Sequence, residues 1–280
     1  MPENPATQDD VSISIHPDSP PWNSGAAFGV WLFSIFALVI LVNAAVLIYA
    51  FTNQINLAQI AEAIQKQTNP NILLVNILAT IPAHLLTIGV VWLVVTRGGK
   101  FPFFQMLGWN WGKNFGFWAS VGTAIGFFLF AGLLVSLFGE TENDLMRILR
   151  SSRAAVYATA FLATFTAPLI EETVYRGVMY SAFRRTFGQI GAVILVTFLF
   201  ALVHVPQYYP SYGVILAILL LSLVLTLVRA WTGNLLPCVV IHTVFNGVQS
   251  ILLIAEPFLF PKTNAPADLP TVFIFPFLFK

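Results

Sequence analysis

Long apolar stretches without formal charge alternate with short polar connections along most of this chain. No Asp, Glu, Lys or Arg occurs in residues 19–61, 67–96, 114–139, 186–228 or 230–255. A helix of about 20 apolar residues crosses the hydrocarbon core of a bilayer. Several of these stretches are long enough for one crossing, and 186–228 is long enough for two. The pattern therefore predicts a helical membrane protein.

The positions of these stretches predict an all-α fold, a polytopic bundle of about seven (six to eight) transmembrane helices. We place the crossings at residues 26–51, 71–95, 115–138, 154–179, 190–204, 213–229 and 235–255. Residues 1–25 are predicted to be a disordered polar N-terminal tail. Residues 26–256 form a single transmembrane domain whose motif-bearing core is 154–255, and 257–280 form a C-terminal tail. Residues 53–69 are expected to be a short amphipathic helix at the membrane interface.

The composition supports a membrane location and gives no indication of nucleic-acid binding. Charged residues make up 9% of the chain and hydrophobic residues 58%, whereas soluble domains have roughly 25% charged residues. The hydrophobic composition makes the lipid bilayer an expected partner. The net charge is only +1, so nucleic acid is not an expected partner. The first 25 residues are acidic and lack Lys and Arg. A cleaved signal peptide is therefore not expected, and the first hydrophobic segment should remain as an anchor.

Ionisable side chains inside a membrane are costly and by default mark function. Glu171, Glu172 and Arg176 stand near the end of the fourth predicted crossing, and His204 closes the fifth. Glu172 and Arg176 are i,i+4 with the acid first, the favourable order for an ion pair. Glu171 points about 100° away from Glu172 around the helix. We interpret Glu172–Arg176 as a structural pair and Glu171 as a candidate general base, unless a loop arginine such as Arg184 pairs with it.

The seventh crossing contributes His242 and Asn246, which are also i,i+4 and can point at one spot. The plainer interpretations are a core histidine bonded to a backbone carbonyl and an asparagine that bridges two helices. His84 also lies inside a predicted crossing. We find no acid or amide at helical spacing from it, and we interpret it as structural.

Together these residues form three motifs in order on successive membrane helices. They read EExxxR (Glu171, Glu172, Arg176), FxxxH (Phe200, His204) and HxxxN (His242, Asn246). This set resembles the CAAX-processing and bacteriocin-processing (CPBP or ABI) family of intramembrane proteases, which is related to the type II CAAX prenyl endopeptidases. The TGNLLP turn at 232–237 is also similar, whereas Tyr175 stands where Phe is common. The resemblance covers residues 154–255.

The resemblance implies an endopeptidase whose substrate is a peptide or protein, possibly membrane-associated. Glu171 with His204 would activate water, His242 and Asn246 would hold the developing oxyanion, and Glu172 with Arg176 would shape the site. No cofactor is then required. The alternative is a zinc-dependent metalloprotease with Glu171, His204 and His242 as ligands. No HExxH helix is present, and we favour the metal-free mechanism.

Two other classes of protein remain open from the sequence. A non-catalytic membrane binding or immunity protein could keep the fold, although the intact set of motif residues argues against it. A small transporter could use intramembrane acids to relay protons, but the related halves that transporters often show are not evident here. The acidic N-terminal region and the lack of eukaryotic retention signals favour a bacterial cytoplasmic (inner) membrane.

Overall fold

The computed structural model describes residues 16–66, 69–139, 149 and 152–259. These residues form α-helices and two π-helical turns, and no strand occurs among them. They are α1 (Ser24–Thr52), α2 (Leu57–Lys66), α3 (Pro70–Leu78), α4 (Thr80–Thr96), α5 (Phe103–Leu107), α6 (Phe117–Phe138), α8 (Arg153–Phe161), η1 (Leu162–Thr166), α9 (Ala167–Glu172), η2 (Thr173–Met179), α10 (Tyr180–Tyr208), α11 (Tyr212–Thr232) and α12 (Leu236–Leu259).

Within the described residues, six helical runs are long and apolar enough to cross a membrane. One of them, Arg153–Tyr208, has 56 residues. A single straight helix of that length would measure about 84 Å, far more than the roughly 30 Å hydrocarbon core. The run turns at Gly188, whose φ of 73° and ψ of 174° are non-helical and suit a residue without a Cβ. It therefore supplies two crossings, so the all-α bundle of about seven is confirmed.

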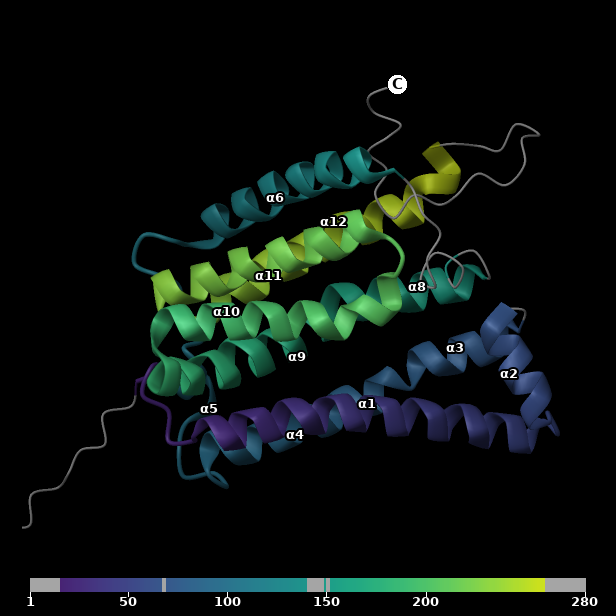
Figure 1. The fold of residues 1–280 in the computed structure, drawn as a ribbon, viewed down its shortest axis with the longest axis horizontal. Helices are drawn as coiled ribbons and strands as arrows, with labels where there is room; N and C mark the ends of the chain where they lie inside the picture. Colours follow the sequence, from purple (N-terminus) through teal and green to yellow (C-terminus); the bar gives the residue numbers. More distant parts are fainter. Residues whose placement is uncertain (1–15, 67–68, 140–148, 150–151, 260–280) are drawn as a thin grey trace, which may run out of the picture.

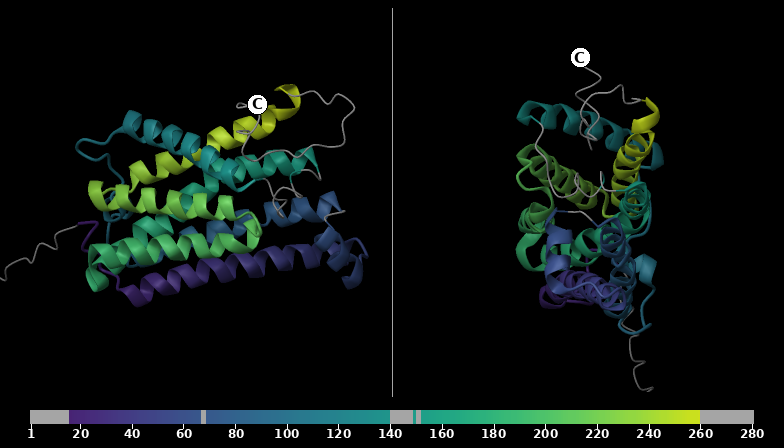
Figure 2. Two further views of the ribbon diagram at one scale, coloured as in Figure 1. Left: turned by 45° about the horizontal axis from the view of Figure 1, so that its top comes forward. Right: turned by 90° about the vertical axis from the view of Figure 1, so that its right-hand side faces the viewer.

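The helices lie side by side with their axes along the long dimension of the molecule (Figure 1). α6 forms one edge and packs on α11 and α12, whereas α1 and α4 pack together at the opposite edge. The helices α9 and α10 and the two π-helical turns lie between these edges, and the end-on view in Figure 2 shows the bundle to be more than one helix thick. The EExxxR motif is therefore carried by the middle of the bundle.

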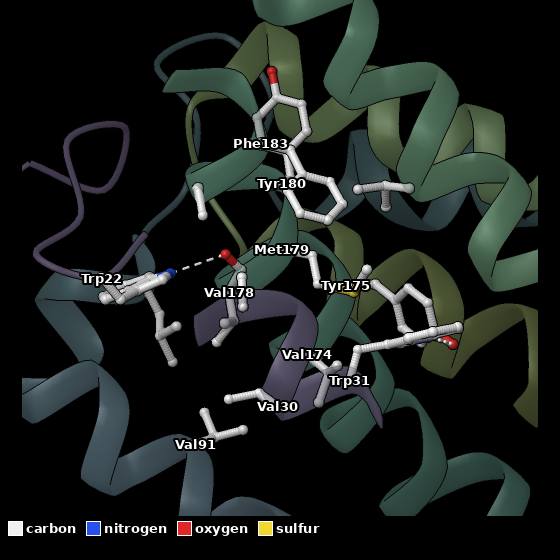
Figure 3. Packing of buried hydrophobic residues seen from close by; sticks show 14 of the residues in the cluster. Trp22, Val30, Trp31, Val91, Val174, Tyr175, Val178, Met179, Tyr180 and Phe183 are labelled. Carbon is white, nitrogen blue, oxygen red and sulfur yellow. Dashed lines mark hydrogen bonds between the residues drawn. The ribbon is translucent and has the colours of Figure 1, made fainter. Parts of the chain in front are cut away.

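The largest buried cluster joins the start of α1 to the η2 turn (Figure 3). The indole Nε1 of Trp22 donates to the carbonyl oxygen of Val178 at 3.0 Å, and Nε1 of Trp31 donates to the hydroxyl of Tyr175 at 2.9 Å. Buried indole N–H groups need an acceptor, and these two bonds supply it within an apolar core. The helix that carries the EExxxR motif is thus fixed on its α1 side.

The residues just before α1 differ from the predicted disordered tail. Asp18 forms ion pairs with Arg184 and with Arg229, the second at 3.2 Å, and the Arg229 side chain is fully buried. Arg97 donates to the carbonyl oxygen of Pro21. Because a buried guanidinium needs a nearby anion, the segment before α1 packs on the ends of α10 and α11. Residues 16–23 therefore include tertiary contacts that a disordered tail would lack, while residues 1–15 lie outside the described part.

The remaining boundaries agree closely with the hydrophobic pattern. α2 occupies the segment expected to be amphipathic, and Ile60 and Ala63 on one side of it pack against α1 and α3. α12 continues to Leu259, slightly beyond the expected boundary at 256. The rest of the predicted C-terminal tail, 260–280, lies outside the described residues.

Candidate functional site

The two glutamates lie on a short α-helical stretch between two π-helical turns. η1 precedes α9 and η2 follows it, so Glu171 and Glu172 end a six-residue α-helix. Pro168 near the start of α9 lacks a backbone N–H and interrupts the regular hydrogen-bond ladder. π-helical turns are rare and often occur at functional sites because they re-aim neighbouring side chains. Here they set the direction of the EExxxR residues.

A partly open cavity of about 430 Å³ lies between the helices of the bundle. Glu171, His204, His242 and Asn246 all line it, and they come from α9, α10 and α12. Side chains of α3 and α4 line the cavity as well. Residues of all three motifs therefore line one cavity, whose remaining lining is largely apolar. A volume of this size suits a small molecule or a short peptide segment.

Glu172 and Arg176 lie behind the cavity wall and are both fully buried. Arg176 Nη1 donates to Glu172 Oε1 at 2.9 Å. The same carboxylate oxygen is 2.8 Å from His242 Nδ1, a contact that the sequence analysis did not predict. Because 70 residues separate Glu172 from His242, no local spacing could indicate it. Glu172 thus contacts both the arginine and a histidine of the cavity.

Arg176 extends this contact to α11. Its guanidinium donates to the Ser222 hydroxyl at 2.7 Å, to the Ser222 carbonyl oxygen at 2.9 Å and to the Thr226 hydroxyl at 3.3 Å. It also lies 4.7 Å from the ring centroid of Phe200, close enough for a cation–π contact. A charge-assisted network of this kind fixes η2 against α11. Phe200 accordingly packs between the arginine and the site.

Glu171 is the more accessible of the two acids, with 26% of its side chain exposed. Its Oε2 lies 3.9 Å from His242 Nε2, too far for a hydrogen bond. The alternative partner suggested by the sequence, Arg184, pairs with Asp18 instead. That alternative is therefore wrong. Glu171 is left facing the cavity with an imidazole beside it.

The hydrogen bonds of the two motif histidines fix which ring nitrogen carries a proton. His204 Nδ1 is 2.7 Å from the Phe200 carbonyl oxygen, which can only accept, so Nδ1–H donates. His242 Nδ1 likewise donates to the carboxylate of Glu172. In a neutral imidazole the other nitrogen, Nε2, is then a proton acceptor. Nε2 of each ring is thus the nitrogen that is left for a ligand in the cavity, which both histidines line.

Asn246 uses its side-chain amide both to join helices and to line the cavity. Its Nδ2 donates to the carbonyl oxygen of Ala163 in η1 at 2.8 Å. An amide NH₂ has two donors, so one N–H remains for another acceptor. The helix-bridging role foreseen for Asn246 and a role in the cavity are therefore compatible.

His84 is a cavity residue that the sequence analysis treated as structural. It lines the same cavity as Glu171, and its Nδ1 is 3.1 Å from the Thr166 hydroxyl. The sequence did hold a signal, since Thr80 and Asn76 stand four and eight residues before it and also line the cavity. Residues at this spacing share one face of a helix.

The zinc alternative depends on how closely its three ligands approach one another. Among residues 16–66, 69–139, 149 and 152–259, no group of three or more His, Cys, Asp or Glu side chains is placed to hold a metal ion. A three-ligand zinc site needs donor atoms about 2.0–2.2 Å from a common point. The zinc alternative with Glu171, His204 and His242 as ligands stays a prediction that metal analysis has to test.

These features define an all-α integral membrane protein with carboxylate and imidazole groups on one cavity between its helices. The pattern of a protease family, described as Type II CAAX prenyl endopeptidase Rce1-like, matches residues 153–248. The match spans about a third of the 280 residues and contains all three motifs, and it confirms the resemblance to the CAAX-protease family. Comparison with curated proteins and with solved structures gives no match.

Proposed function

We propose that the protein is an intramembrane endopeptidase that hydrolyses a peptide bond with water activated by Glu171. The observation that carries this proposal is the meeting of Glu171, His204, His242 and Asn246 on one cavity. Titratable groups gathered in a cavity are the usual mark of a catalytic site. The similarity of residues 153–248 to a prenyl endopeptidase family supports the same reaction class.

The catalytic role of each residue follows from the hydrogen-bond donors and acceptors that its side chain has free. Glu171, assisted by Nε2 of His204, takes a proton from water, and the water oxygen bonds to the peptide carbonyl carbon. The carbonyl oxygen gains the negative charge. It accepts from the free N–H of Asn246, and from Nε2–H of His242 when that ring carries a second proton. When the C–N bond breaks, the proton held by Glu171 passes to the leaving amine.

The family description also suggests a substrate class for this chain. The matched family is named for prenyl endopeptidases that act on CAAX sequences, and we propose a membrane-associated peptide or protein as the substrate. A prenyl chain can partition into the bilayer beside a cavity at membrane depth. The proposed location is a bacterial inner membrane.

Hydrolysis of a defined probe tests the proposed function. The purified full chain, in detergent or in liposomes, would be incubated with a quenched fluorogenic peptide that ends in a farnesylated CaaX sequence. A matched peptide without the farnesyl group would be the second probe. Cleavage of either probe by the wild-type protein, and not by the Glu171→Gln variant, is the expected result. Absence of cleavage, or equal cleavage by both proteins, would contradict the proposal.

Removal of metal should leave the activity unchanged. Prolonged dialysis against a strong chelator is expected to preserve the rate, because an amide such as Asn246 is a good oxyanion donor and a poor zinc ligand. Elemental analysis should find no stoichiometric zinc in the purified protein. Loss of activity on chelation, with recovery on adding zinc alone, would instead establish the metalloprotease alternative.

A transporter or a non-catalytic binding protein predicts a different outcome from the same cavity. In both classes Glu171 would bind a proton or a ligand, and the peptide probe would remain uncleaved. Mass spectrometry of the incubated probes separates these classes from an endopeptidase, because only an endopeptidase yields two fragments that differ from the intact probe by one water.

A further inference from the structure

The wall of the cavity opposite the motif residues carries a stripe of polar side chains. Asn76 in α3, and Thr80 and His84 in α4, all line the cavity. The single residue between the two helices, Ala79, has helical angles of −66° and −11°, so the stripe continues across the junction. The three positions are four residues apart, a rise of about 6 Å for each step along the helix.

The hydrogen bonds of this stripe leave specific groups free. Thr166 donates its hydroxyl to the Leu162 carbonyl oxygen, so it accepts from Nδ1–H of His84 at 3.1 Å, and Nε2 of His84 stays a free acceptor. Thr80 donates to the Ile77 carbonyl oxygen at 2.8 Å. The side chain of Asn76 forms no hydrogen bond with any residue in the described part of the chain, and it is only half-buried.

Free polar groups at membrane depth call for an occupant of matching chemistry. An unsatisfied donor or acceptor is costly where water is scarce. An amide and an imidazole acceptor complement the N–H and C=O groups of a peptide backbone. A helical peptide satisfies those groups internally and would gain nothing from the stripe. An extended peptide leaves them free, and it repeats every two residues over about 6.6–6.8 Å, close to the 6 Å step of the stripe.

We propose that Asn76 and His84 bind the backbone of the substrate and hold it extended against the wall that carries Glu171. This inference rests on the proposed function and assigns the substrate-binding side of the same site. Thr80 contributes its oxygen as a further acceptor between them. The two residues are positioning residues for the peptide, and neither takes part in proton transfer.

The purely structural alternative is that His84 only ties α4 to η1 through Thr166. Asn76 separates the two interpretations, because its side chain has no partner to lose in the described structure. Asn76→Leu should leave the melting temperature unchanged and weaken peptide binding. The matched control is Asn43→Leu in α1, where Asn43 is exposed, bonds only to the Val39 carbonyl oxygen and does not line the cavity.

Peptide binding is measured in a protein that cannot cleave the peptide. A failure of the proposed binding role can then be told apart from a failure of the proposed protease function. Anisotropy of a labelled farnesylated CaaX peptide would give the Kd with the Glu171→Gln protein as background. Adding Asn76→Leu or His84→Leu should each raise the Kd by roughly three- to tenfold, the value of one neutral hydrogen bond. The control Asn43→Leu should not change it.

A backbone scan of the peptide tests the contact directly. Replacing one peptide amide at a time by an ester removes a single N–H. At one peptide position, the ester should bind the Glu171→Gln protein more weakly than the amide does. When His84→Leu is added to that protein, the ester and the amide should bind equally well. If the wild-type protein cleaves the probe while Asn76→Leu and His84→Leu leave both Kd and KM unchanged, the inference is wrong. If no probe is bound or cleaved at all, the proposed function itself fails.

Discussion

Replacing Glu171 by Gln is expected to lower the rate of peptide hydrolysis by about 10²–10⁴-fold, the range supplied by a general base. Gln keeps the size of the side chain but cannot take a proton from water. Its folding cost should be small, because Glu171 is partly exposed and the ring nitrogen Nε2 of His242 is 3.9 Å away, beyond hydrogen-bond distance. The measurement pairs kcat for a quenched peptide with the melting temperature in the same detergent.

The sharpest control for that variant is Glu171→Asp. Asp keeps the carboxylate but draws it back by one methylene group, so a partial rate should survive if proton transfer is the role of Glu171. A structural role predicts the opposite order, with Gln tolerated better than Asp. A Glu171→Gln protein that melts normally and cleaves at the wild-type rate would exclude Glu171 as the base.

The neighbouring substitution, Glu172→Gln, is expected to act mainly on stability. Glu172 and Arg176 are fully buried and 2.9 Å apart, and removing one partner of such a pair costs about 3–5 kcal/mol. The guanidinium would keep only neutral acceptors on α11, the side chains of Ser222 and Thr226 and one carbonyl oxygen. Thermal or denaturant unfolding of Glu172→Gln beside Glu171→Gln measures the difference.

A double-mutant cycle shows whether the loss comes from the ion pair. Glu172→Gln combined with Arg176→Met should cost less than the sum of the two single losses, because no charge is left unpaired. Activity should also fall in Glu172→Gln beyond the loss of folded protein, since Glu172 holds Nδ1 of His242 at 2.8 Å. Equal stability losses for Glu171→Gln and Glu172→Gln would contradict the separate roles of the two acids.

The membrane topology could be predicted from the sequence because it depends on length and charge alone. A span needs about 20 uncharged apolar residues. The seven predicted crossings coincide with observed helical segments, and two of them, 115–138 and 235–255, begin one or two residues before the helix does. The turn between the fourth and fifth crossings lies at Gly188, within the gap left between 179 and 190. Such features are local in the chain, so a pattern of residues is enough to place them.

The contacts that the sequence did not reveal all join residues far apart in the chain. Asp18 pairs with Arg229 across 211 positions, and Arg229 is fully buried although it stands at a helix end. The sequence analysis treated Asp18 as part of a disordered tail because acidic and proline residues cluster there. Helical spacing relates residues three or four apart and carries no information on which distant segment will cover a buried charge.

The candidate site shows the same limit. The pairing of Glu172 with Arg176 follows from i,i+4 spacing and is present at 2.9 Å. The second contact of Glu172, to His242, depends on how α9 and α12 pack. The place of His84 on the cavity depends likewise on the packing of α4 against η1. Family motifs could point to the residues of one wall, but they contain nothing about the wall that faces them.

The central claim is that water, activated at Glu171, is added across a peptide bond of the substrate. The most direct measurement is cleavage of the fluorogenic peptide in H₂¹⁸O, with the product mass determined after a single turnover. The account predicts one ¹⁸O in the new carboxylate of the product from wild-type protein treated with chelator, and no product from Glu171→Gln in the same time. Labelled product formed equally by both proteins would contradict it.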